Sequence, residues 1–199
     1  MVSFKKNTGK EIIIEAARQA FSKYGYKKTT LDDIGSLIKK RKTIIYYYFE
    51  NKDEIFKEVI NSEAEKLKGA LEMAINNESN PVEKLKTYVF TRMSFLENLG
   101  NYYSALKHEL LEHLQLINEN RKEIDAAEFI IVSNILKEGV NKAIFSVDNI
   151  NETTQIFITT LKSLEIPFFV REDKYDYQSS LMQLLNMLLY GIIRKYNTA

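Results

Sequence analysis

Hydrophobic residues recur every three to four positions along most of this chain, the spacing that places them on one face of an α-helix. A T-x-x-E capping pattern at Thr8 opens the first predicted helix, and Gly25 ends it. Similar capping patterns at Thr30 and Asn51 open a short second helix and a long fourth one. Only 7 Gly and 2 Pro interrupt the 199 residues, so we expect an all-α fold of about nine helices.

The expected helices share this periodicity and follow one another closely. Their predicted ranges are 8–24, 30–38, 41–48, 52–76, 81–97, 101–118, 121–144, 149–164 and 175–196. The β-branched run at 129–132 could also form a strand, but the 3–4 spacing around it favours a helix.

The final helix is apolar on more than one face and therefore needs packing partners on two sides. One side can be the chain's own core, and the other is most simply a second copy of the chain. We therefore expect a homodimer whose interface includes five residues of this helix: Leu181, Leu184, Leu185, Leu188 and Ile192.

Charge divides the chain into a basic head and an acidic body. Residues 1–52 hold 12 Lys and Arg against 5 acidic residues, a charge of +7, and the remainder carries −6. A basic module on an acidic body is typical of nucleic-acid binding, although a chance surface imbalance is the alternative. We place one domain at 1–52 and a second at 53–199.

Several other classes of protein find no support in the sequence. With no cysteine there is no disulfide framework or thiolate zinc site, and the start of the chain does not look like a signal peptide. No apolar run is long enough to span a membrane, and we expect a cytoplasmic protein. His108 and His113 lie five residues apart, off one helical face, so we expect no metal, no cofactor and no catalytic activity.

The stretch 29–52 carries the chemistry expected of a DNA-reading unit. In its predicted helix 41–48, Ile45 would face inward together with Phe49, which leaves a basic and tyrosine-rich outer face. Such a face offers short side chains for base edges and cations for phosphates, although a solvated turn is the alternative for the lysines. For Tyr48 we favour packing. The expected DNA contacts are Thr30, Lys39, Lys40, Arg41, Lys42, Thr43, Tyr46, Tyr47 and Lys52.

Residues 11–56 resemble the DNA-binding domain of the tetracycline-repressor (TetR) family. That family's pattern, roughly I-x-x-A-A-x-x-x-F-x-x-x-G-Y-x-x-T-T/S, D-D-I-A, G-V-S-K-G and T-L-Y-Y-Y-F-x-x-K, is matched by seventeen residues. These are Ile13, Ala16, Ala17, Phe21, Gly25, Tyr26, Thr29, Thr30, Asp32, Asp33, Ile34, Lys42, Tyr46, Tyr47, Tyr48, Phe49 and Lys52.

The chain departs from the family pattern at the turn before the recognition helix. Lys39 replaces the turn glycine, Lys40 the valine and Arg41 the capping serine. A non-Gly residue at positive φ costs on the order of 1 kcal/mol, and a lost Ser cap about 1 kcal/mol more. The added cations could offset this through phosphate contacts, so we expect salt-dependent binding in which Arg41, Thr43 and Tyr46 read the bases.

The resemblance implies a helical ligand-binding and dimerisation domain at 53–199 that binds a small hydrophobic or amphipathic effector. It also implies a dimeric repressor that binds a palindromic operator and is released by that effector. The alternative is a helical ligand-binding or protein-interaction protein with degenerate DNA reading. The candidate pocket walls, which could also be simple core, are Phe90, Met93, Phe95, Tyr102, Tyr103, Leu106, Phe129 and Ile130.

Overall fold

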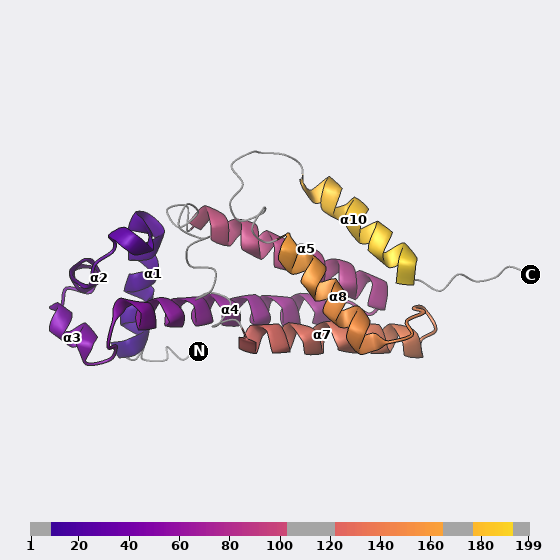
Figure 1. The fold of residues 1–199 in the computed structure, drawn as a ribbon, viewed down its shortest axis with the longest axis horizontal. Coiled ribbons are helices and arrows are strands. Elements are labelled where there is room, and N and C mark those ends of the chain that lie inside the picture. Colours follow the sequence, from indigo (N-terminus) through magenta and orange to yellow (C-terminus); the bar gives the residue numbers. More distant parts are fainter. Residues whose placement is uncertain (1–8, 103–121, 165–176, 193–199) are drawn as a thin grey trace, which may run out of the picture. The chain divides into compact units, whose positions relative to one another are not determined.

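The computed structural model describes residues 9–102, 122–164 and 177–192, and every regular element in these ranges is a helix (Figure 1). The all-α expectation is therefore confirmed for the described residues. The helices are α1 (Gly9–Lys28), α2 (Leu31–Leu37), α3 (Lys42–Tyr46), α4 (Lys52–Asn76), α5 (Pro81–Tyr102), α7 (Lys122–Asn141), α8 (Ile150–Ser163) and α10 (Tyr177–Ile192). Beyond Tyr102, the predicted helix at 101–118 lies outside the described residues.

The chain divides into two compact units, and α4 contributes to both of them. The first unit is built mainly from the residues up to Lys66, and the second from Leu67–Glu97 together with α7, α8 and α10. The predicted division at residues 52 and 53 stays a prediction.

Aromatic rings form the centre of the first unit. The ring of Phe56, one turn into α4, lies 5.4 Å from Phe21 in an edge-on arrangement and 4.7 Å from Tyr26. Edge-on and tilted pairs are favoured because the positive ring edge meets the negative ring face. Gly25 takes φ 79°, so the helical path of α1 breaks there and Tyr26 turns inward. The predicted stop at Gly25 is confirmed.

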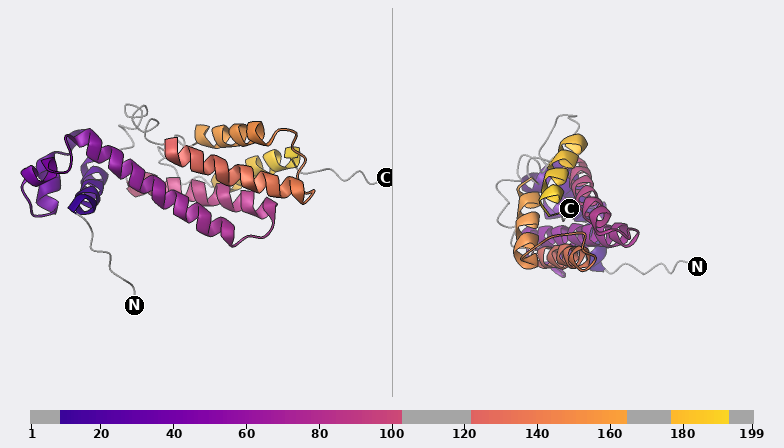
Figure 2. Two further views of the ribbon diagram at one scale, coloured as in Figure 1. Left: turned by 90° about the horizontal axis from the view of Figure 1, so that it is seen from below. Right: turned by 90° about the vertical axis from the view of Figure 1, so that its right-hand side faces the viewer.

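The second unit packs its helices around one apolar core. Buried side chains from the end of α4 and from α5, α7, α8 and α10 form a single cluster, and Figure 2 shows these helices from two further directions. The segment 129–132 lies within α7, so the preference for helix over strand is confirmed.

A buried polar group ties α5 to α7 inside this core. The Nε of Arg92 donates to Oε1 of Glu128 at 2.6 Å, and the Tyr88 hydroxyl donates to the same oxygen at 3.0 Å. All three side chains are fully buried. Burial, together with the charge of Glu128, raises the pKa of Tyr88 well above its usual value, so the hydroxyl keeps its proton and can donate.

Candidate nucleic-acid interface

Helix α2 begins with a complete capping box. The Thr30 hydroxyl accepts from the backbone N–H of Asp33 at 3.2 Å, and the Asp33 carboxylate accepts from the backbone N–H of Thr30 at 2.8 Å. The hydrogen bonds from the Thr30 side chain and backbone lower the pKa of Asp33. The predicted cap is confirmed, and it fixes where α2 starts.

The turn between α2 and α3 is tight and strained. Lys39 takes φ 55°, the left-handed region that the family pattern fills with glycine. The backbone N–H of Lys40 then donates to the carbonyl oxygen of Gly35 at 2.9 Å. A Cβ on Gly35 would lie 2.7 Å from the carbonyl oxygen of Lys40, so the backbone of the turn leaves no room for one. Sequence reasoning missed Gly35, because its importance depends on a contact five residues away.

Helix α3 starts without a side-chain cap. Arg41 occupies the N-cap position with an extended backbone but makes no capping hydrogen bond through its side chain. The expected loss of the serine cap is therefore confirmed. Arg41 is an exposed residue beside the turn.

The two faces of α3 divide as the sequence predicts. Ile45 is fully buried, and Phe49 just after the helix is 2% exposed, whereas Tyr46 is 55% and Tyr47 82% exposed. The ring of Tyr47 meets that of Tyr48 edge-on, with centroids 5.0 Å apart, and most of its surface remains available to a partner. Tyr48 packs against α1, since a Cβ on Gly9 would lie only 2.3 Å from its hydroxyl oxygen.

Cations surround this exposed face. Lys39, Lys40, Arg41, Lys42 and the neighbouring Thr43 are all exposed. Lys42 reaches back to α2, where its Nζ lies 3.2 Å from the carboxylate of Asp32. Because both side chains of this pair are largely exposed, the pair contributes little and can give way to a phosphate.

Two of the predicted DNA contacts hold the structure of the head together. The Nζ of Lys52 donates to the backbone carbonyls of Tyr26 at 2.7 Å, Thr29 at 3.0 Å and Lys27 at 3.4 Å. It also lies 4.3 Å from the centre of the Tyr26 ring. The hydroxyl of Thr30 belongs to the capping box described above. The structure thus gives both side chains intramolecular partners, and their contact with DNA stays a prediction.

The candidate pocket residues do not share one environment. Met93 is fully buried, whereas Phe90, Phe95 and Phe129 are partly buried against the core of the second unit. Ile130 is 59% exposed and lies apart from that core. The remaining candidates, the side chain of Tyr102 and residues Tyr103 and Leu106, lie outside the description. A ligand pocket at these positions stays a prediction.

The expected dimer residues of α10 divide between the core and its edge. Leu181 and Leu185 are buried in the chain's own core, and a dimer interface at these residues stays a prediction. Leu184 and Leu188 are partly covered, and the side chain of Ile192 lies outside the description. The most exposed apolar side chains described on α8 and α10 are Ile156, Met182 and Met187.

No group of three or more metal-ligating side chains occurs among the described residues, and His108 and His113 lie outside them. Within the same ranges, no helix combines the length and the apolarity that a membrane crossing requires.

Residues 13–59 match the sequence profile of a family described as bacterial regulatory proteins, tetR family. An uncharacterised HTH-type transcriptional regulator of Bacillus subtilis, YhgD, is 39% identical over 59 residues, which is 30% of this chain and 31% of that protein. The match thus spans under a third of that relative.

Longer alignments extend the similarity into the second unit. The HTH-type regulator QacR of Staphylococcus aureus is 23% identical over 94% of this chain and 98% of its own length. The negative regulator IcaR of the icaADBC biofilm operon in Staphylococcus epidermidis is 28% identical over 55% of this chain and 63% of its own. These relatives are transcriptional regulators and not enzymes.

Solved structures share the fold over almost the whole chain. The regulator FadR from Bacillus subtilis, solved with stearoyl-CoA, superposes with a TM-score of 0.69 at 22% identity, over 91% of this chain and 98% of that one. At this identity, the similarity shows the fold alone.

Proposed function

We propose that this chain belongs to the tetR family of bacterial regulatory proteins and that it is a dimeric cytoplasmic repressor of transcription. It binds a palindromic operator through α3 and is released by a small hydrophobic or amphipathic ligand in the second unit. The observation that carries the proposal is the division of α3 between a buried anchor, Ile45, and an exposed face of tyrosines and cations.

The geometry supports a binding mode dominated by phosphates. Four consecutive exposed cations, Lys39 to Lys42, lie at the turn and at the start of α3. A helix that enters the major groove brings such residues close to the backbone on either side. In a dimer the two recognition helices must lie about 34–36 Å apart to enter successive major grooves, which is why the operator is palindromic.

The proposal that a ligand releases the repressor rests on the relatives and on composition. FadR of Bacillus subtilis was solved with stearoyl-CoA, an amphipathic acyl thioester. The second unit of this chain offers a large apolar core with several partly buried aromatic residues. An apolar effector that favours a form unable to bind DNA would weaken operator binding typically by about 1–3 kcal/mol.

Selection of bound duplexes from genomic DNA, followed by anisotropy titration, tests the proposal. We expect a palindromic consensus and an affinity that falls steeply with salt. Tyr47→Ala and Lys42→Ala should each weaken binding, whereas Lys57→Ala, an exposed lysine on α4, serves as the control. Unchanged affinity in both interface variants would favour a ligand-binding protein with degenerate DNA reading.

A further inference from the structure

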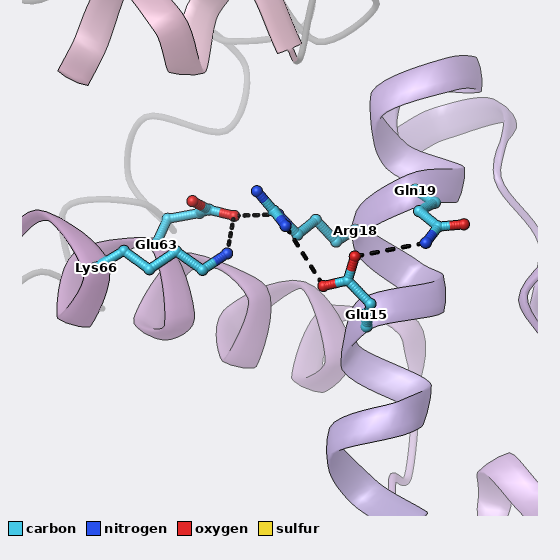
Figure 3. Close-up of polar contacts among 5 residues, drawn as sticks. All are labelled: Glu15, Arg18, Gln19, Glu63 and Lys66. Atoms are coloured by element: carbon cyan, nitrogen blue, oxygen red, sulfur yellow. Dashed lines mark hydrogen bonds and ion pairs between the residues drawn. The ribbon is translucent and has the colours of Figure 1, made fainter. Parts of the chain in front are cut away.

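Four side chains of alternating charge link α1 to α4 within the first unit (Figure 3). Arg18 on α1 places its Nε 2.5 Å from Oε1 of Glu63 on α4. Glu15, one turn earlier on α1, lies 3.4 Å from Nη1 of Arg18. Lys66, one turn later on α4, lies 3.3 Å from Oε1 of Glu63. The group contains two cations and two anions, so it is neutral as a whole.

The central pair of this group, Arg18 with Glu63, is better shielded from water than a surface ion pair. The Glu63 side chain is only 9% exposed and that of Arg18 24%, whereas a second ion pair between α1 and α4, Lys10 with Glu58, has side chains 43% and 31% exposed. Pairs that are partly buried are screened much less by salt than exposed ones. Salt therefore screens Arg18 with Glu63 less than it screens Lys10 with Glu58.

The position of this pair along α4 allows it to restrict the direction of the helix. The aromatic contacts that anchor α4 to α1 centre on Phe56, near the start of α4. Glu63 lies seven residues further on, which is about two turns or roughly 10 Å along the axis. A contact at that distance restricts the angle between α1 and α4 more than one at the anchor does.

Each end of the pair has a second partner on its own helix. If α4 moved away from α1, Arg18 would keep Glu15 and Glu63 would keep Lys66, both at i,i+3 spacing. Breaking a buried ion pair usually costs about 3–5 kcal/mol because one charge is left uncompensated. Here neither charge is left without a partner, so the contact can open and close reversibly.

We propose that Arg18 and Glu63 form a latch that holds α4 in one direction relative to α1, and that the closed latch is the operator-binding form. The inference rests on the proposed dimeric DNA binding. Two heads fit successive major grooves only when each has a defined orientation on its α4. A head that samples several orientations must be ordered upon binding, and this ordering weakens affinity. Both residues lie outside α3, so they are positioning residues.

Distances between α1 and α4 in the full-length protein test the latch without DNA. The chain has no cysteine, so Lys23→Cys and Glu65→Cys, both at exposed positions, accept spin labels at defined sites. Pulsed electron paramagnetic resonance measures the distribution of distances between the two labels. Glu63→Gln should broaden this distribution because the latch opens. Lys66→Gln should leave the distribution unchanged, because Lys66 contacts Glu63 from the same helix and does not link α4 to α1. Glu83→Gln, which breaks an exposed i,i+3 pair with Lys86, is the matched control.

Operator affinity tests the role of the latch in DNA binding. Glu63→Gln should weaken binding between about five- and a hundredfold, whereas Lys66→Gln should leave it unchanged. A loss confined to Glu63→Gln is the signature, because a purely structural role of the charged group predicts a loss from either substitution. Broadening in both variants, or altered distances with unaltered affinity, overturns the inference. If the wild-type protein binds no duplex, the proposed function fails, while the distances still decide whether the latch exists.

Discussion

Replacing Lys39 by glycine separates the conformational and electrostatic roles of the turn before α3. Lys39 holds φ 55°, where a side chain crowds the backbone. Its ammonium also belongs to the row of exposed cations proposed to contact phosphates. Lys39→Gly removes both the strain and the charge, whereas Lys39→Ala removes the charge and keeps the strain.

The expected gain in stability follows from two opposing contributions. A left-handed residue other than glycine costs roughly 1–2 kcal/mol in the folded state. Glycine loses more conformational entropy on folding than other residues, which reduces the gain in stability by about 0.5–1 kcal/mol. Lys39→Gly should therefore be about 0.5–1 kcal/mol more stable than Lys39→Ala, or about 1–4 °C in Tm for a chain of this size. Ala143, also at φ 55°, offers an uncharged control in the second unit: Ala143→Gly should show a similar gain.

Urea unfolding and duplex titration at several salt concentrations measure the two roles separately. Each phosphate contact contributes about 0.9 to the slope of log K against log salt. Removing one cation from each protomer of a dimer should reduce the slope by about 2, equally in the glycine and alanine variants. If Lys39→Gly were no more stable than Lys39→Ala, the argument from backbone strain would be wrong. An unchanged slope would show that Lys39 does not contact the phosphates.

Four further predictions follow from contacts in the two units. Thr30→Ala should lower the free energy of unfolding by about 1 kcal/mol in urea. The pKa of Asp33 is lowered in the folded protein, so its carboxylate stabilises the fold above the unfolded pKa, and this effect is lost as pH falls through the folded pKa. A pH series of urea unfolding should therefore show the stabilities of Asp33→Asn and wild type converging in acid. Ile45→Ala should cost about 2–5 kcal/mol and weaken duplex binding, whereas an unchanged unfolding midpoint would contradict its burial. Glu128→Leu should cost about 3–5 kcal/mol in the same assay, and adding Arg92→Met should recover much of the loss.

Local patterns in the sequence predicted most of the DNA-binding head. The cap of α2 depends on Thr30 and Asp33, three residues apart, and the inward positions of α3 depend on the spacing between Ile45 and Phe49. Both follow from helix geometry, which the sequence expresses over one or two turns. The strain at Lys39 was also predictable, because the family pattern marks that position for glycine.

Contacts between distant residues were not predictable in this way. Lys52 was expected to meet phosphates, but its ammonium binds carbonyls more than twenty residues earlier in the sequence, at the end of α1. Arg92 and Glu128 are 36 residues apart, and nothing in their local periodicity marks them as a buried pair. A side chain with a long flexible stem takes the partner that the tertiary fold brings close, and helical spacing does not reveal that partner.

The unusual turn shifts stability from the free protein to its complex. Lys39 and Arg41 replace residues that would relax or cap the turn, so the free head carries both penalties. The same two residues add positive charge beside the exposed face of α3, where an operator would bring phosphates. Any ligand that binds only the folded state stabilises it by RT ln(1 + [L]/Kd), about 2.7 kcal/mol at a hundredfold excess over Kd. That is about as large as the two penalties together, so a head that is weakly stable alone should become firmly folded on its operator.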